Sequence, residues 1–423
     1  MSIHMHAEST SMRGNERATI KAHPATLHHP RPYGKRISSR KEGESHARAA
    51  RAILPSIALL CLLLAGCGFS QGAPGHTFQG KLHLLQVPTP YSLPGQIVLG
   101  PDGNLWFPAV AYGNFTTDKP SGAIGQLTPS GKFHMFPMPT ANSYPLAIAF
   151  GHDGKLWFSA FQGNGKLAPN VDQAPRFSGG YSEFGQMSQD GKFHMFTLPS
   201  STISPRSIAV GADGNLWFTD TGAGSNDAWV NKIGRFTPSG AFSEFPLTLR
   251  KATDFINLLI AGPDGNLWFS IDSELPDYSV FGEMGRITPQ GTVTIFTLGK
   301  FVEPRDMTVG PDNNIWFSSG GLIGRITMKG QLHLFNPDPQ NRSNYMSSSG
   351  ITSGSDGALW FATVNVAVGR VTTAGTFKFY PFPPNTNFDN GGSSLDIGNL
   401  RGIVTGADGT LWLTNDAQIG HFV

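Results

Sequence analysis

Three arginines occupy the same place in a pattern that repeats along the chain. Arg206, Arg305 and Arg401 each lie five residues before the first Gly of a Gly-x-Asp-Gly-like string. A guanidinium group presents several fixed donors that suit carboxylate, sulfate or phosphate. In the other copies the same place holds Gly95, Leu146, Asn257 and Ser349. Because this position varies while its surroundings repeat, we expect Arg206, Arg305, Arg401 and Asn257 to bind an anionic or polyhydroxylated small ligand.

A second interpretation of these arginines stays open. Buried charges without partners are costly, and the chain offers nearby acids that would pair with the arginines and leave no site. These acids are Asp220, Asp254, Glu303, Asp306, Asp396 and Asp416. Aromatic residues in the variable segments either stack on a ligand ring or pack the loops. Trp229 is the one Trp outside the repeated pattern, so we include it among the ligand-binding candidates.

The elements that position these residues follow from the repeat. The string Gly-x-Asp-Gly-x-Leu-Trp-Phe and its close variants occur seven times, 44 to 60 residues apart. Each copy continues through a variable loop, an Ile-Gly-Arg-like segment, a second Gly turn and an alternating segment such as Lys132–Phe136. Four short strands per repeat at this spacing are typical of a β-propeller blade. The sequence predicts an all-β, seven-bladed β-propeller over residues 80–423.

The two ends of this region predict how the ring closes. The seventh repeat stops at Ile419–Val423, a third strand with no fourth strand after it. The missing strand matches Gly80–Leu85, which resembles the outer segments Gly131–Phe136 and Gly191–Phe196. Pairing the N-terminal strand with the last blade removes two open sheet edges. We therefore expect one closed domain, present as a monomer.

Composition and charge exclude several classes of protein. The chain has 52 Gly and 31 Pro but only 14% charged residues, which disfavours a helical protein. The formal net charge of +2 comes from residues 1–51, which hold 10 Lys and Arg against 4 acids. The remainder has 21 basic against 25 acidic residues. This part lacks the basic excess that a phosphate backbone attracts, so we expect no nucleic-acid partner.

The N-terminal segment has the features of a targeting signal. An apolar run from Ile53 to Gly66 is too short to cross a bilayer as a helix but suits a signal-peptide core. The string Leu64-Ala65-Gly66-Cys67 resembles the bacterial lipoprotein processing site. That resemblance implies a basic extension and signal peptide in residues 1–66, a lipid on Cys67, a tether over 67–79, and location in the bacterial cell envelope. The alternative is a buried apolar helix with an incidental Cys.

The whole repeat also resembles a known family. The combination Pro-x-x-Ile-x-x-Gly-x-Asp-Gly-x-Leu-Trp-Phe, then Ile-Gly-Arg-Ile-Thr-Pro-x-Gly, is similar to the virginiamycin B lyase (streptogramin lyase) family over residues 80–423. The resemblance implies a magnesium-dependent elimination that opens a cyclic depsipeptide at an ester. It places the site in blades six and seven. There it implies a substrate-contacting His, a Glu-Pro-His with a metal ligand and the base, and a Glu four residues after the Trp.

This chain departs from that set at most positions. The substrate-contacting His falls on Ser349, and Glu-Pro-His falls on Asn399-Leu400-Arg401. Arg401 cannot act as the base because arginine stays protonated. Asp416 keeps the acid after the Trp, so Asp416 and Asn399 are the candidate ligands for magnesium (Mg²⁺), held with waters and substrate. We assign no catalytic residue and no firm cofactor.

Two functions follow from these observations. The first is a membrane-anchored lipoprotein whose propeller binds a ligand or a cell-envelope partner at its loop face, with a degenerate lyase site. The alternative is a magnesium-dependent lyase, or a lactonase-like hydrolase, with a rearranged site. For the latter, the candidate axial ligands are Asn257, Asn399, Asp220, Asp416 and Glu303. The histidines at equivalent outer positions, His83, His134, His194 and His333, are expected to be structural.

Overall fold

The structure is a computed structural model that divides into two units, Met1–Cys67 and Gly68–Val423. It describes residues 80–88, 91–92, 94–111, 122–163, 181–196, 198, 203, 205–223, 229–251, 253–275, 279–337, 348–363, 367–382, 402–415 and 418–423. The expected signal peptide, Cys67 and the tether lie outside these residues. Within the described ranges, none of the elements is a helix of the length and apolarity needed to cross a membrane.

Short strands make up the blades of the second unit, and the blades are numbered here in chain order. Blade one contains β2 (Tyr91–Ser92), β3 (Val98–Leu99), β4 (Leu105–Ala111), β5 (Gly122–Leu127) and β6 (Phe133–Pro137). Blade two contains β7 (Ser143–Phe150), β8 (Leu156–Gln162), β9 (Tyr181–Met187) and β10 (Phe193–Phe196). Blade three contains β11 (Pro205–Val210), β12 (Leu216–Ala223), β13 (Trp229–Phe236) and β14 (Phe242–Pro246).

The remaining blades follow the same plan. Blade four contains β15 (Phe255–Ala261), β16 (Leu267–Glu274), β17 (Val280–Ile287) and β18 (Val293–Lys300). Blade five contains β19 (Asp306–Val309), β20 (Ile315–Ser319), β21 (Leu322–Ile326) and β22 (Leu332–Phe335). Blade six contains β23 (Ser348–Ser353), β24 (Leu359–Thr363), β25 (Ala367–Val371) and β26 (Phe377–Pro381). Blade seven contains β27 (Gly402–Thr405), β28 (Leu411–Thr414), β29 (Gln418–Phe422) and, from the other end of the chain, β1 (Leu82–Gln86).

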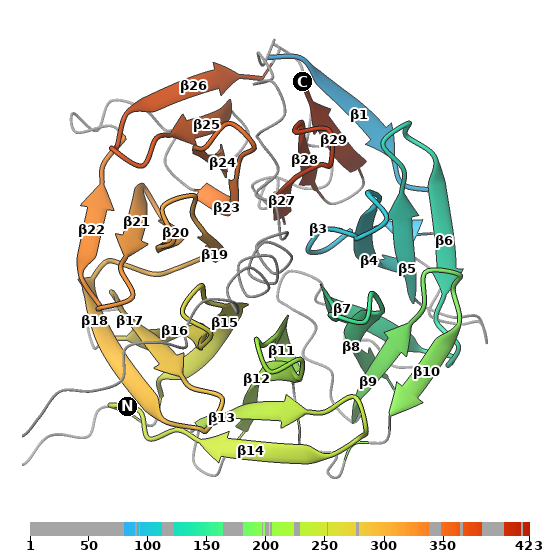
Figure 1. The fold of residues 1–423 in the computed structure, drawn as a ribbon, viewed down its shortest axis with the longest axis horizontal. Helices are drawn as coiled ribbons and strands as arrows, with labels where there is room; N and C mark the ends of the chain where they lie inside the picture. The colour runs from blue at the N-terminus through green and yellow to red at the C-terminus, as the bar shows by residue number, and fades with distance from the viewer. Residues whose placement is uncertain are drawn as a thin grey trace, which may run out of the picture. The chain divides into compact units, whose positions relative to one another are not determined.

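Seven antiparallel sheets surround a common centre (Figure 1). The strands nearest the centre are β3, β7, β11, β15, β19, β23 and β27. The seven-bladed, all-β prediction is confirmed. The predicted closure is also confirmed, because β1 pairs with β29 from Leu82 opposite Phe422 to Gln86 opposite Gln418. The backbones of Lys81 and Val423 extend the pairing with two further hydrogen bonds. Tight turns therefore share one face of the ring, and the variable loops share the other face, which we call the mouth.

The repeated Gly-x-Asp-Gly string forms the turn between the first two strands of each blade. Its last residue has a positive φ, as in Gly265 at 76°, and Asn313 takes this place at 56° in blade five. Gly and Asn tolerate that conformation at low cost. The Asp side chain accepts bonds within the turn and from the Trp: in blade four, Asp264 accepts from the Asn266 backbone at 3.2 Å and from Trp268 Nε1 at 3.1 Å. In blade four this acid is thus engaged in holding the turn.

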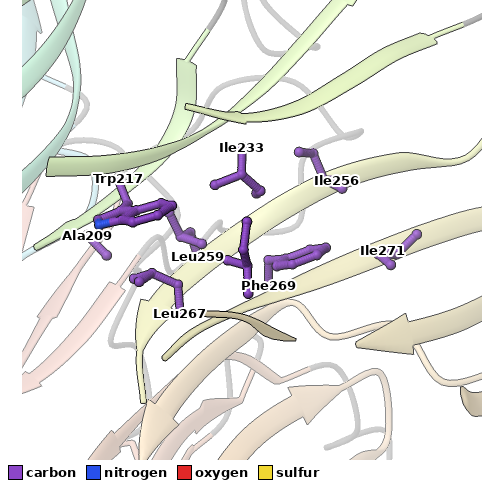
Figure 2. Packing of buried hydrophobic residues seen from close by; sticks show 9 residues of the cluster. Ala209, Trp217, Ile233, Ile256, Leu259, Leu267, Phe269 and Ile271 are labelled. Atoms are coloured by element: carbon purple, nitrogen blue, oxygen red, sulfur yellow. The ribbon is translucent and has the colours of Figure 1, made fainter. Parts of the chain in front are cut away.

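The core lies between neighbouring blades. Figure 2 shows one such cluster, where Trp217 and Ile233 of blade three meet Leu259, Leu267 and Phe269 of blade four. All seven repeated Trp side chains are at most 1% exposed. The spacing between Trp-Phe and Ile-Gly, which repeats from blade to blade, also has a steric cause. A Cβ added to Gly285 would lie 2.0 Å from the Phe269 ring, so only Gly fits beneath that ring.

Arginines of the third strands link one blade to the next. The Arg286 guanidinium lies over the Trp268 ring, 5.6 Å from its centroid, and donates a hydrogen bond to the Met328 carbonyl of blade five at 2.9 Å. Arg235 makes the equivalent bond to Pro289. The histidines of β1, β6, β10 and β22 lie on the outer strands, which confirms their expected position. These repeated polar residues stabilise the ring at a distance from the mouth.

Candidate functional site

The variable position before each turn coincides with a break in the innermost strand. The strand pairing shifts register between Pro145 and Ala147, Pro205 and Ile208, Ile256 and Leu259, and Ser348 and Gly350. These shifts contain Leu146, Arg206, Asn257 and Ser349, the same position in four blades. A β-bulge re-aims side chains and is common beside functional sites. In four blades the fold therefore leaves the ladder irregular at a position whose residue differs from blade to blade.

The structure describes only some of the predicted site residues. Arg401, Asn399 and Asp416 lie outside the described residues, so the expected magnesium ligands and the position of the family base are not placed. Ser349 belongs to β23 and Trp229 begins β13, but their side chains are outside the described set. Arg206, Asn257 and Arg305 are described, and all three lie at the mouth end of their blades.

Arg305 and Arg206 have different surroundings. Arg305 Nη2 lies 3.7 Å from Glu303 Oε2, and their side chains are 45% and 36% exposed. An exposed pair at this distance contributes little to stability, so a ligand can replace it at low cost. Partial desolvation by its neighbours lowers the pKa of Arg206, although the residue is exposed and arginine's ordinary value is high enough to keep it charged at neutral pH. Arg305 is paired with the neighbouring acid Glu303, which is one of the two interpretations that the sequence left open.

Asp272 is a functional candidate that sequence reasoning missed. It lies near the end of β16 at the mouth and is 5% exposed. Its Oδ1 atom has no hydrogen-bond partner within the described part of the chain. Burial and the charge of Glu303 raise its pKa to about 7, against the opposing effects of the Asn257 amide and Arg305. A buried carboxyl that titrates near neutrality is able to accept or donate a proton under ordinary conditions.

The direction of the Asp272 side chain follows from strand alternation. Trp268, Ser270 and Asp272 lie on one face of β16, and Trp268 packs in a cluster with Val302 and Met307 of the blade-five side. Asp272 therefore faces the junction of blades four and five, where Glu303 and Arg305 lie. A signal for it existed in the sequence. Asp272 follows its Trp by four residues, the same spacing as Asp416 after Trp412.

Three other acids near the mouth have altered pKa values. Burial raises the pKa of Asp306 to about 7, although its two oxygens accept hydrogen bonds from the backbone nitrogens of Met307 and Ile351, each at 2.8 Å. Burial also raises the pKa of Glu183, which accepts from Ser143 Oγ at 3.1 Å, and the pKa of Glu283. Through the bond that it accepts from Ile351, Asp306 connects blade five to blade six. Asp272 differs from it in having an oxygen left without a partner.

Metal chemistry gains no new site from these acids. No group of three or more His, Cys, Asp or Glu side chains arranged to hold a metal occurs among the residues that the structure describes. The positive Arg305 beside Asp272 and Glu303 also disfavours a cation there.

Comparisons of the sequence with known proteins agree with the seven-bladed fold. A model of the virginiamycin B lyase family matches residues 75–168, 166–345 and 279–421. A virginiamycin B lyase of Nocardia farcinica (strain IFM 10152) is 25% identical over 188 residues, 44% of this chain and 52% of that protein. The alignment therefore spans about half the length of this relative.

Solved structures give the same result at the level of the fold. A streptogramin B lyase structure is 25% identical with a TM-score of 0.57, covering 81% of this chain and 97% of that one. A catalytically inactive virginiamycin B lyase from Staphylococcus aureus with quinupristin is 24% identical with a TM-score of 0.58, covering 81% and 98%. The fold defines a seven-bladed propeller whose variable loops share one face. With the family match over most of the ring, the chain belongs to the virginiamycin B lyase family.

Proposed function

We propose that this protein is a ligand-binding member of its family, with the family's catalytic set replaced, and that it holds an anionic or polyhydroxylated small molecule at the mouth of the propeller. The observation that carries the proposal is the contrast at the bulged position. The frame repeats in every blade, while the bulge carries Arg206, Asn257 and, in the equivalent place, Arg305. Arg206 and Arg305 are both exposed. Binding a ligand through guanidinium and amide groups does not require a catalytic base.

A binding measurement tests this function directly. Calorimetric titrations would use sulfate, inorganic phosphate and citrate as anionic probes, and cellohexaose, chitohexaose and maltohexaose as neutral ones. We expect at least one probe to bind, and Arg206→Gln, Arg305→Gln or Arg401→Gln to weaken an anionic probe about tenfold or more. Lys155→Gln, on the turn face, serves as the matched control. Equal binding by all four variants, or no binding by any probe, contradicts the proposal.

A second candidate function is an elimination or lactone opening with a rearranged site. The observation favouring it is Asp272, whose pKa of about 7 suits a group that removes a proton next to a carbonyl. If this candidate holds, the protein linearises a cyclic depsipeptide and Asp272→Asn abolishes the reaction. EDTA then decides whether magnesium at Asp416 and Asn399 takes part. The absence of product from wild-type protein, with the fold intact, removes this candidate.

The location of the protein forms part of the same proposal. The lipoprotein-like string ending in Cys67 supports export and a lipid anchor in a bacterial envelope, which would present the mouth to molecules outside the cytoplasm. Multiple acyl chains on one Cys provide stable membrane attachment. We expect wild-type protein in the membrane fraction and Cys67→Ser in the soluble fraction. Equal partition of the two proteins contradicts the anchor.

A further inference from the structure

The segment between β18 and β19 is fixed to both neighbouring blades. The Phe301 backbone nitrogen donates to the Val280 carbonyl of blade four at 2.9 Å. The Glu303 nitrogen donates to Ser319 Oγ at 2.8 Å, and the Arg305 nitrogen donates to the Ser318 carbonyl of blade five at 2.9 Å. Alternate residues thus anchor this segment through their backbones. A loop held in this way presents its side chains in a defined arrangement.

The same segment alternates in burial. Val302 and Pro304 are buried, whereas Phe301, Glu303 and Arg305 are partly or fully exposed. Phe301 is 67% exposed, which is unusual for a large apolar side chain, and its φ is 64°. A bulky residue is strained in that conformation. The segment therefore presents an aromatic ring, a carboxylate and a guanidinium to solvent, beginning from a strained residue.

Asp272 of β16 and Asn257 of β15 are the residues of blade four that lie near this segment. The charges of Glu303 and Arg305 both act on Asp272, and the Asn257 side chain favours the ionised form of its carboxyl group. Asp272 Oδ1, in a side chain that is 5% exposed, has no hydrogen-bond partner among the described residues. A buried polar atom left in that state costs free energy that a donor group of a ligand would recover. The unpartnered oxygen is a second indication, independent of the loop, that something binds at this junction.

We propose that the junction of blades four and five is a subsite for a sugar-like ring, which packs its apolar face on Phe301 and offers hydroxyl groups to Asp272, Asn257, Glu303 and Arg305. This inference rests on the proposed binding function and names the ligand class. Hydroxyl groups both donate and accept, and the subsite provides carboxylate acceptors beside guanidinium and amide donors. The CH-rich face of a pyranose matches an exposed aromatic ring.

The charge of the junction favours a neutral ring over an ion. Glu303 and Arg305 form one oppositely charged pair, which leaves Asp272 as the remaining acid. An ammonium ligand would meet Arg305 and also Lys300, whose Nζ lies 5.0 Å from the Phe301 ring centroid. An anionic ligand would meet Glu303 and Asp272. A neutral polyhydroxylated ring avoids both repulsions.

The test is titration of the full chain with cellohexaose, chitohexaose and maltohexaose at pH 7. We expect at least one of them to bind, and Phe301→Ala and Asp272→Asn each to weaken that binding by about tenfold or more. Leu334→Ala is the matched control, because Leu334 is an exposed apolar residue on the outer strand β22. Phe301→Gly separates binding from folding. It removes the strained conformation, so we expect an unchanged or higher Tm together with the same loss of binding.

The outcomes distinguish this inference from the function on which it rests. A neutral oligosaccharide that binds all variants equally overturns the subsite, while ligand binding by the propeller stands. Binding of anions alone, with loss in Arg206→Gln and none in Phe301→Ala, also overturns the subsite. No binding by any neutral or anionic probe removes both proposals.

Discussion

Asp356 on the turn face and Asp272 at the mouth have pKa values that are shifted in opposite directions. Asp356, in a repeated turn, accepts hydrogen bonds from Trp360 Nε1 at 3.1 Å and Arg370 Nε at 2.6 Å. Burial by itself would raise its pKa, but these bonds and the backbone bond from Ala358 outweigh burial and lower it. At the mouth, burial raises the pKa of Asp272 to about 7. Acids that repeat are saturated with donors, whereas the acid that breaks the repeat is not.

This difference separates two kinds of acid within one ring. Asp312 and Asp356 contact both the indole of the buried Trp and the third-strand Arg of their blade, and their pKa values are lowered, so their charge stabilises the native state. Asp272 is buried without equivalent compensation, so its charge destabilises the native state. Proteins retain such residues at sites where a ligand or a reaction uses them. The comparison gives three predictions, each of which changes one acid.

Asp356→Ala should cause the greatest loss of stability. It leaves the Trp360 indole nitrogen and the Arg370 guanidinium without their shared acceptor, and we expect a loss of about 3 kcal/mol in the free energy of unfolding. Urea unfolding at pH 7 measures it. The pKa of Asp356 is lowered, so its contribution is present above the ordinary value of 3.8 and disappears as the pH falls through the lowered value. Asp190→Ala, an exposed turn residue, is the control; equal losses for both variants contradict the assigned role.

Asp272→Asn should raise the stability of the protein at high pH, whereas Asp356→Ala lowers it. The native pKa is raised from 3.8 to about 7, so wild-type protein loses stability as the pH rises between those values, and the full cost is present above about 7. The neutral Asn avoids that cost. We expect the variant to be similar to wild type near pH 3.5 and more stable at pH 8, by up to about 4 kcal/mol, the free energy that a rise in pKa from 3.8 to about 7 represents. A stability difference that does not change with pH contradicts the ionisation of a buried Asp272.

Asp306→Asn should give the smallest change, a destabilisation of about 1 kcal/mol at pH 3, where the wild-type carboxyl is protonated in the native and the unfolded state alike. The amide has one acceptor oxygen, so one of the backbone nitrogens of Met307 and Ile351 loses its bond. Urea unfolding at pH 3 measures this effect. If Asp306→Asn leaves the stability unchanged or raises it at that pH, the two backbone hydrogen bonds do not stabilise the junction of blades five and six.

The fold was predictable because its signals repeat. Seven copies of the Trp string, the hairpin turns and the unfinished last repeat determine the number of blades and the pairing of β1 with β29. The outer histidines were placed correctly for the same reason. Arg206, Asn257 and Arg305 were placed at the mouth by their spacing from the turn, a local property of the sequence.

The site was less predictable because it depends on contacts between blades. Asp272 carried the right spacing after Trp268, but only the packing of β16 against blade five reveals its burial and its Glu303 neighbour. The strained φ of Phe301 follows from a loop fixed at both ends, which composition does not indicate. The bulges around Arg206 and Asn257 likewise arise from strand pairing across the sheet.

A titration of the aspartate carboxyl groups by carbon-13 NMR provides the most direct test, with Asp272→Asn and Asp356→Asn used to assign the two signals. We expect the Asp272 resonance to titrate near pH 7 and the Asp356 resonance to titrate below 3.8. If Asp272 titrates at or below 3.8, its charge is already compensated in the native state, and the contrast between mouth and turn face fails.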